Sequence, residues 1–207
     1  MEKAERKEKE FLFRRAEILA QAGKIFADKG FHNTTVAEIA GASGFAIGTL
    51  YQFFNSKDDL YTTMISEKLE QMYAEIEATA ARPEGFSARL RELVQAHFRF
   101  AEDNPDFGRQ FIRGVSTSMP EANAKLHAQM IGKRRQHLLY LETLMQQGIR
   151  ERLLRAIEPR SMAQALQGMI HAFTFEWMLA PEKDALIGMI DTILKIFING
   201  VSIRDES

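Results

Sequence analysis

Histidine has the widest chemical range of the side chains in this sequence, because an imidazole can bind a metal ion or act as a general acid or base. Four histidines lie beyond residue 90, namely His97, His127, His137 and His171. They show neither an i, i+4 pair nor an HExxH pattern. The chain also lacks cysteine, which excludes disulfides, thiolate metal sites and thiol catalysis. We therefore expect histidines with structural roles, no metal, no cofactor and no enzyme activity.

A second group of side chains has the chemistry for contact with DNA. Gln52 can bond the N6/N7 edge of adenine, and Ile47 or Thr49 can touch a thymine methyl group. Hydroxyl and ammonium groups nearby can donate to phosphate. The predicted contact residues are Thr34, Thr35, Ala46, Ile47, Gly48, Thr49, Tyr51, Gln52 and Lys57. The alternative is an ordinary helical subdomain with an exposed tyrosine.

Two short helices and the start of a third must position these groups. Thr35 and Glu38 form a capping box, which predicts a helix that begins near Val36. Gly44 permits a sharp turn, and a second helix at about 46–54 would bury Leu50 and Phe54. Ser56 and Asp59 form another capping-box pattern, which predicts a third helix from Lys57. This is the helix-turn-helix pattern, whose second helix enters the DNA major groove.

The segment from Thr34 to Leu60 resembles the N-terminal domain of the tetracycline-repressor (TetR) family. Matching positions are Thr35-Val36, Ile39-Ala40, Gly44, Gly48-Thr49-Leu50-Tyr51, Phe54, Lys57 and Leu60. The resemblance implies a bacterial transcription regulator that forms a homodimer, binds an operator and holds an effector between the helices of its second domain. Ile47, Ala46 and Phe53 depart from the polar residues common in the family at these positions.

The rest of the chain is predicted to be helical as well. Residues 13–29 form a supporting helix closed by Gly30, whereas residues 1–10 are predicted to be a frayed helix or a disordered arm, either solvated or reaching into a minor groove. The later predicted helices are 57–80, 86–102, 105–114, 120–154, 161–179 and 183–201, with Ser161 and Gln164 as a cap and 81–86 as a linker. The fold class is all-α, with a helix-turn-helix domain at 11–60, a connecting helix at 57–80 and an effector-binding and dimerisation domain at 61–207.

The last two predicted helices are apolar on more than one side. Terminal helices are rarely central in a fold, so we expect a two-fold dimer through a four-helix bundle. The predicted interface residues are Phe175, Leu179, Leu186, Ile190, Ile193 and Phe197. Glu176 lies among aromatic residues and would need a partner, either an arginine or a cationic ligand.

Residues 86–180 are rich in Met and Phe, which suits a core and also an adaptable apolar cavity. The predicted effector pocket consists of His97, Phe98, Phe111, Met130, His137, Leu141, Met169 and Phe173. These walls are mostly apolar with two imidazoles. A small hydrophobic effector with one or two hydrogen-bonding groups would fit them, whereas a sugar phosphate would find too few donors.

The 207 residues carry a net charge of −1 and contain neither a secretory segment nor an apolar run long enough to span a membrane. We expect a cytoplasmic protein with no membrane partner. The predicted function is a DNA-binding transcriptional regulator, a repressor released from a pseudo-palindromic double-stranded operator by a small hydrophobic effector. Residues 1–60 contain nine Lys or Arg and nine Asp or Glu. Their zero net charge motivates the alternative, an all-helical ligand-binding or adaptor protein whose helix-turn-helix has lost DNA binding.

Overall fold

We analysed a computed structural model, which describes residues 2–81, 85–109, 122–180 and 185–201. These residues form helices and contain no β-strand. They divide into two compact units, the first made of Met1–Lys68 and Asp106–Ala128 and the second of Leu69–Pro105 and Gln129–Ser207. The division falls inside α4 (Lys57–Ala80) and inside α7 (Ala122–Arg150).

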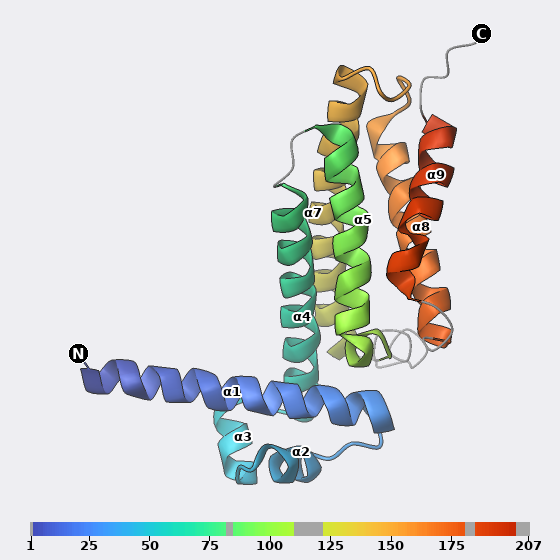
Figure 1. Cartoon of the computed structure of the whole chain (residues 1–207). Helices are drawn as coiled ribbons and strands as arrows, with labels where there is room; N and C mark the ends of the chain where they lie inside the picture. Colours follow the sequence, from blue (N-terminus) through green and yellow to red (C-terminus); the bar gives the residue numbers. More distant parts are fainter. Residues whose placement is uncertain (1, 82–84, 110–121, 181–184, 202–207) are drawn as a thin grey trace. The chain divides into compact units, whose positions relative to one another are not determined.

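The first unit contains α1 (Glu2–Lys29), α2 (Val36–Ser43), α3 (Ile47–Phe53) and the beginning of α4. The helix α1 lies across α2 and α3 (Figure 1). Its inner face contributes Ile18, Ala22 and Phe26 to a core completed by residues of the other three helices. These are Ile39, Ala40, Leu50, Phe54, Leu60, Tyr61, Met64 and Ile65.

The charged stretch at the start of the chain belongs to α1, which runs unbroken from Glu2. The disordered arm is therefore wrong as an alternative for these residues. Alternating Lys and Glu support a helix through i, i+4 pairs, and Arg14 indeed bonds the carboxylate of Glu10. At the other end Gly30, with φ 77°, closes α1 as predicted.

The caps of α2 follow the sequence prediction. The Glu38 N–H donates to Oγ1 of Thr35 at 3.2 Å, and the Thr35 N–H donates to the Glu38 carboxylate at 2.8 Å. Gly44, at φ 73°, turns the chain toward α3. At α4 only half of the predicted box forms: the Asp59 N–H donates to Oγ of Ser56, but the Asp59 carboxylate accepts from the Asn55 N–H.

The second unit is a bundle of helices (Figure 1). It contains the later part of α4, α5 (Phe86–Asp103), α7 (Ala122–Arg150) from Gln129 onward, α8 (Pro159–Leu179), the 3₁₀ turn η1 (Leu186–Met189) and α9 (Ile190–Val201). Its core joins side chains from all of these elements. Among them are Ile76, Phe86, Leu93, Phe98, Leu141, Leu144, Met145, Leu166, Ile193 and Phe197.

Three predicted boundaries in this unit are wrong. The helix α7 ends at Arg150 rather than Leu154, because Arg152 adopts φ 58° and the Leu153 N–H bonds back to the Gly148 carbonyl. Pro159 is the first residue of α8, and Ser161 hydrogen-bonds the Glu158 carboxylate instead of capping the helix. The last helix is preceded by η1.

Other predicted boundaries are only partly covered by the described residues. Residues 105–109 are helical, as predicted after Asn104, but the end of this helix lies outside the described part of the chain. Pro120 and Lys183, the predicted first residues of the helices 120–154 and 183–201, also lie outside the described residues. The predicted linker at 81–86 is described only at its two ends, where Gly85 adopts φ 81° just before α5.

Candidate functional site

The helix α3 has one buried edge and one exposed face. Leu50 and Phe54 are buried and hold the helix against the first unit. Ile47 and Tyr51 are exposed by 45% and 53%, large fractions for apolar and aromatic side chains. Ala46, Gly48 and Gln52 are exposed with them, and Thr49 is half-buried. The structure thus brings six of the nine predicted DNA contacts together on one short helix, with a face that the fold itself does not use.

The other three predicted contacts bond within the protein. Thr34 is buried, and its hydroxyl donates to the Gly30 carbonyl at 2.8 Å. The Thr35 hydroxyl caps α2 by accepting the hydrogen bond from the Glu38 N–H. The Lys57 ammonium donates to the carbonyls of Phe31 and Thr34, at 2.8 Å each, and lies 4.3 Å from the Phe31 ring centroid. These side chains shape the loop between α1 and α2.

Several charges of this unit are paired with each other. Arg15 bonds the Glu67 carboxylate, and Lys29 lies 2.6 Å from Glu38. The hydrogen bond from Lys29, followed by those from Thr35, lowers the pKa of Glu38 to about 2. Because these pairs lie on the surface, they contribute little to stability. They do limit the number of cations available for phosphate.

Phe11 is a residue that the sequence prediction missed. Its ring lies 4.6 Å from that of Phe53 at the end of α3, and half of the side chain is exposed. The contact ties the outer part of α1 to the helix with the exposed face. A short apolar run in a charged segment, Phe11 to Phe13, was the available signal.

In the second unit, the two predicted pocket histidines meet in the interior. The ring centroids of His97 on α5 and His137 on α7 lie 5.0 Å apart, and Tyr73 of α4 stacks on His137 at 4.7 Å. Phe98 and Leu141 are buried beside them in the same core, and Met169 and Phe173 are partly buried against it. Met130 is half-buried, and Phe111 lies outside the described residues.

Both histidines are neutral near pH 7. Burial, together with a smaller effect of neighbouring imidazoles, lowers the pKa of His97 to about 4 and that of His137 to about 3. Nδ1 of His97 lies 2.9 Å from the Leu93 carbonyl oxygen, so this nitrogen carries the proton and donates. Nδ1 of His137 faces the Glu77 carboxylate at 3.4 Å, and burial raises the pKa of that carboxyl.

Three buried polar atoms of the second unit have no hydrogen-bond partner among the described residues. They are Nε2 of His137, the hydroxyl of Tyr140 and Nε2 of Gln167. The oxygen of the Gln167 amide accepts from Nε of Arg134 at 3.3 Å. Sequence reasoning missed Tyr140, Gln167 and Glu77, because a single polar residue on a helix carries no signal until its neighbours are known.

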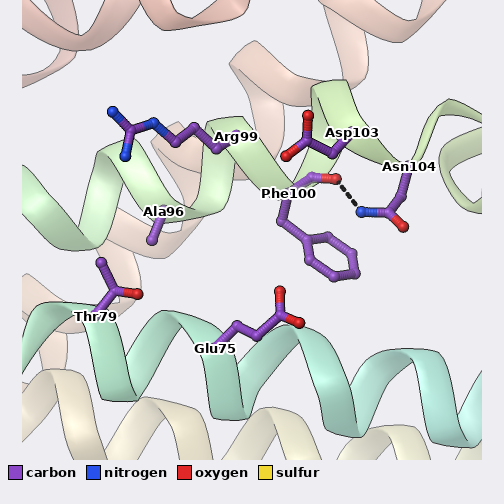
Figure 2. A pocket seen from close by; sticks show the side chains of 7 residues that line it. All are labelled: Glu75, Thr79, Ala96, Arg99, Phe100, Asp103 and Asn104. Atoms are coloured by element: carbon purple, nitrogen blue, oxygen red, sulfur yellow. Dashed lines mark hydrogen bonds between the residues drawn. The ribbon is translucent and has the colours of Figure 1, made fainter.

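A separate cavity of about 200 Å³ opens between α4 and α5. Figure 2 shows Glu75 and Thr79 of α4 and Ala96 and Phe100 of α5 pointing toward the space between the two helices, and Arg99, Asp103 and Asn104 complete the lining. The Asn104 amide donates to the Phe100 carbonyl at 2.8 Å. The lining is largely polar and includes none of the eight predicted effector residues. This cavity therefore does not match the predicted hydrophobic pocket.

Four of the predicted dimer-interface residues have a different role in the structure. Leu186, Ile190, Ile193 and Phe197 are buried in the core of their own subunit, so they are not surface residues. A helix that is apolar all round does not reveal which side faces inward. The other two predicted residues, Phe175 at 46% and Leu179 at 60%, are exposed on α8, as is Ile196 of α9 at 54%.

Other features expected from the sequence can be stated briefly. Glu176 is exposed to solvent and needs no buried partner. Within the described ranges, no group of three or more His, Asp or Glu residues could hold a metal ion. None of the described helices is long and apolar enough to cross a membrane.

Two family models match the chain. The model of bacterial regulatory proteins of the tetR family matches residues 18–64, and a tetracyclin repressor-like C-terminal domain matches residues 83–179. The fatty acid metabolism regulator of Bacillus subtilis is 22% identical over 186 residues, which span 89% of this chain and 94% of that protein. The repressor KstR2 of Mycolicibacterium smegmatis is 37% identical over 92 residues, 43% of each chain.

Solved structures share the fold over nearly the whole chain. The fatty acid degradation regulator FadR of Bacillus halodurans superposes with a TM-score of 0.78 at 21% identity, covering 92% of this chain and 97% of that one. FadR of Bacillus subtilis, solved in complex with stearoyl-CoA, gives a TM-score of 0.77 at 22% identity, with 89% and 98% coverage.

Proposed function

This chain belongs to the tetR family of bacterial regulatory proteins and is a DNA-binding transcriptional regulator, and from that premise we propose that it acts as a homodimeric repressor released by a hydrophobic effector. The exposed face of α3 carries the proposal. An exposed isoleucine and tyrosine beside Gly48 form a surface that admits a close approach to bases. The buried side of the same helix fixes its orientation through Leu50.

We assign α3 as the helix that reads the operator. Gln52 would bond adenine, and Ile47 and Thr49 would contact thymine methyl groups. Tyr51 would donate to phosphate. Because residues 1–60 have no basic excess, non-specific affinity should be low, and base contacts should supply an unusually large share of binding.

The dimer would use the exposed apolar residues of α8 and α9. Phe175, Leu179 and Ile196 are large side chains that a second copy could cover. A two-fold axis presents two copies of α3, so the operator would be pseudo-palindromic, with half-sites one or more helical turns apart.

The effector site would lie in the second unit, around His97, Phe98, His137, Leu141, Met169 and Phe173. Its walls are apolar with neutral imidazoles, which suits a long apolar chain with a small polar group. Stearoyl-CoA is the first compound to test, because a structural relative was solved in complex with it. Release requires only that the ligand bind the DNA-free state more tightly, and couplings of about 1–3 kcal/mol are typical.

Fluorescence anisotropy with the DNA upstream of the chain's own gene tests this function. Parent protein should bind a palindromic segment at nanomolar to micromolar concentration, and stearoyl-CoA should lower the signal. Tyr51→Ala serves as the binding-deficient control. If the parent protein binds no fragment of the DNA upstream of its own gene, the result would favour a ligand-binding protein that has lost DNA recognition.

A further inference from the structure

We infer that His137, Tyr140 and Gln167, here called the polar strip, hold the polar group that adjoins the apolar chain of the effector, and that this group is uncharged and has a hydrogen-bond-accepting oxygen, as the thioester of stearoyl-CoA has. The inference rests on the proposed function, because it specifies the ligand of the site proposed above. His137 and Gln167 are each more than nine-tenths buried, and each has a polar atom without a partner in the described structure. Buried polar groups are nearly always hydrogen-bonded, so these atoms call for an outside partner.

The donor role of Gln167 in the strip is fixed by its neighbour Arg134. An arginine side chain can only donate, so the Gln167 oxygen must face Arg134, and the Gln167 nitrogen is left with hydrogens to offer. The Tyr140 hydroxyl is a second donor. Two buried donors without acceptors favour a ligand that brings an acceptor oxygen.

The strip is continuous along one face of α7. Arg134, His137 and Tyr140 are spaced three residues apart, and the rings of the latter two lie 6.2 Å between centroids. From His137 to Tyr140 the strip covers three residues, or about 4.5 Å of helix. Gln167 of α8 joins this face through its bond to Arg134.

Apolar side chains flank the strip on both helices. Leu141 follows Tyr140 on α7, and Leu166 and Ile170 bracket Gln167 on α8, all three buried. Phe173 is partly buried one turn further on. A ligand anchored at the strip would therefore continue into an apolar surrounding, which suits an alkyl chain.

The electrostatics of the strip disfavour an anionic head group. The groups around His137 are Tyr73 and Glu77 from α4, His97 from α5, Tyr140 from α7 and His171 from α8, and Arg134 acts on the neighbouring Tyr73 and His171. Burial keeps both inner imidazoles neutral at pH 7, and the carboxyl of Glu77 faces Nδ1 of His137. Arg134 is exposed and already faces Gln167. Among the residues that the structure describes, a buried carboxylate would thus find no buried cation at the strip, whereas a neutral carbonyl needs only the two donors.

Calorimetric titration of three twelve-carbon probes at pH 8 tests the inference on the free protein. Methyl dodecanoate offers an uncharged acceptor, dodecan-1-ol an uncharged hydroxyl, and dodecanoate a carboxylate on the same chain. We expect the ester and the alcohol to bind at least 10-fold more tightly than dodecanoate. Equal affinities, tighter binding of dodecanoate or no binding of the ester would overturn the inference.

Variants separate a ligand contact from a structural role. Tyr140→Phe and Gln167→Leu should each lower ester affinity about 5- to 10-fold, the loss of one hydrogen bond. Their melting temperatures should stay the same or rise, since an unpartnered polar atom is removed from the interior. Tyr73→Phe is the matched control, because it deletes a hydroxyl from the other ring that stacks on His137, and it should leave ester affinity unchanged. Lower melting temperatures with intact ester affinity would mean that only bound water satisfies the strip, and would overturn the inference.

The two proposals fail separately. If the probes follow the expected order but release no operator, the strip is a ligand site and the proposed regulation is wrong. If stearoyl-CoA releases operator equally from parent, Tyr140→Phe and Gln167→Leu, the regulation holds and the strip is not the anchor.

Discussion

The Lys57 ammonium donates a 2.8 Å hydrogen bond to the carbonyl oxygen of Thr34, the residue just before the N-cap of α2. A second bond of 2.8 Å to the Phe31 carbonyl and the contact with the Phe31 ring complete its surroundings. The start of α4 is thereby fastened to the loop that leads into the helix-turn-helix. Lys57 therefore positions α2, although its residue type and place had suggested a phosphate contact.

Replacing Lys57 by Met should weaken operator binding without removing a phosphate contact. The plot of log affinity against log salt should keep its slope, whereas loss of a true contact lowers the slope by about 0.9. The melting temperature of the variant should fall, because two carbonyl oxygens lose their donor. Anisotropy titrations over a range of salt concentrations measure the slope.

Lys24→Met is the control for this experiment, since Lys24 is an exposed lysine of α1 and its loss changes the net charge equally. It should leave the melting temperature unchanged. A slope that drops for Lys57→Met by about one contact, with unchanged stability, would restore the phosphate role.

Tyr51→Ala should reduce operator affinity by about 1–3 kcal/mol while the protein stays folded, because the side chain is exposed on α3 and supports no core contact. For the neighbouring residue Leu50 we expect a loss of stability. Leu50→Ala should cost about 2–5 kcal/mol of folding free energy, since Leu50 is buried. Gel shifts and thermal denaturation of both variants distinguish the two effects. Equal operator affinity of parent and Tyr51→Ala would mean that α3 does not face the DNA.

An arginine at Leu179 should yield monomers, because a charge would be buried without a partner in the interface. The exposed Leu139 of α7 is the control, and Leu139→Arg should remain dimeric. Ile193→Arg should instead unfold the second unit, since Ile193 is fully buried in its own core. Sedimentation velocity at micromolar concentration reports all three. A dimeric Leu179→Arg protein would place the interface elsewhere.

Acid should destabilise the protein through its buried histidines. Unfolded histidine titrates near pH 6.5, whereas His97 and His137 have folded pKa values of about 4 and about 3. The unfolded state thus binds more protons as the pH falls from 6.5, and stability present above that pH is lost at up to about 1.4 kcal/mol per pH unit for each histidine. Glu77, whose pKa burial raises, acts in the opposite direction and offsets part of the loss.

Urea denaturation from pH 7 to pH 4.5 measures this dependence. The His137→Gln variant should show a shallower fall in the free energy of unfolding than the parent. His32→Gln, a change at an exposed histidine of the first unit, should follow the parent curve. Identical curves for all three proteins would contradict the assignment.

Gly148 is a position where a methyl group has no space. A Cβ atom there would lie 2.8 Å from Cδ1 of Leu154 and 2.9 Å from Cδ2 of Phe86. Gly148→Ala should therefore destabilise the protein by about 1–3 kcal/mol. Gly132→Ala, on the same helix but next to open space, should be neutral or should stabilise by up to about 1 kcal/mol. Thermal denaturation compares them, and equal melting temperatures would show that Leu154 moves aside freely.

The features that the sequence predicted correctly depend on neighbours a few residues apart. Thr35 with Glu38 and the turn at Gly44 define α2 through local bonds, so their residue types were sufficient. Ser161 and Gln164 form an equally good capping pattern, but α8 begins at Pro159, because the proline ring favours the first helical position. The sequence pattern alone does not decide whether Pro159 or Ser161 marks the start of this helix.

Roles that depend on distant contacts could not be predicted. Lys57 meets Phe31 across 26 residues, and Glu77 meets His137 across 60. The roles of Ile193 and Phe197 also depend on distant contacts. Their apolar character predicted burial correctly, but only the packing of α9 shows that their own subunit buries them.

On α3, the residues that hold the helix in the fold are different from those on its exposed face, and this difference affects how such a regulator could evolve. Leu50 and Phe54 anchor the helix, whereas Ile47, Tyr51 and Gln52 contribute almost nothing to the interior. Mutations at these outward positions are nearly neutral for folding, so they can accumulate and be selected for a new binding sequence without a compensating change elsewhere. A duplicated copy of the gene could acquire another set of target promoters while keeping its stability and its ligand.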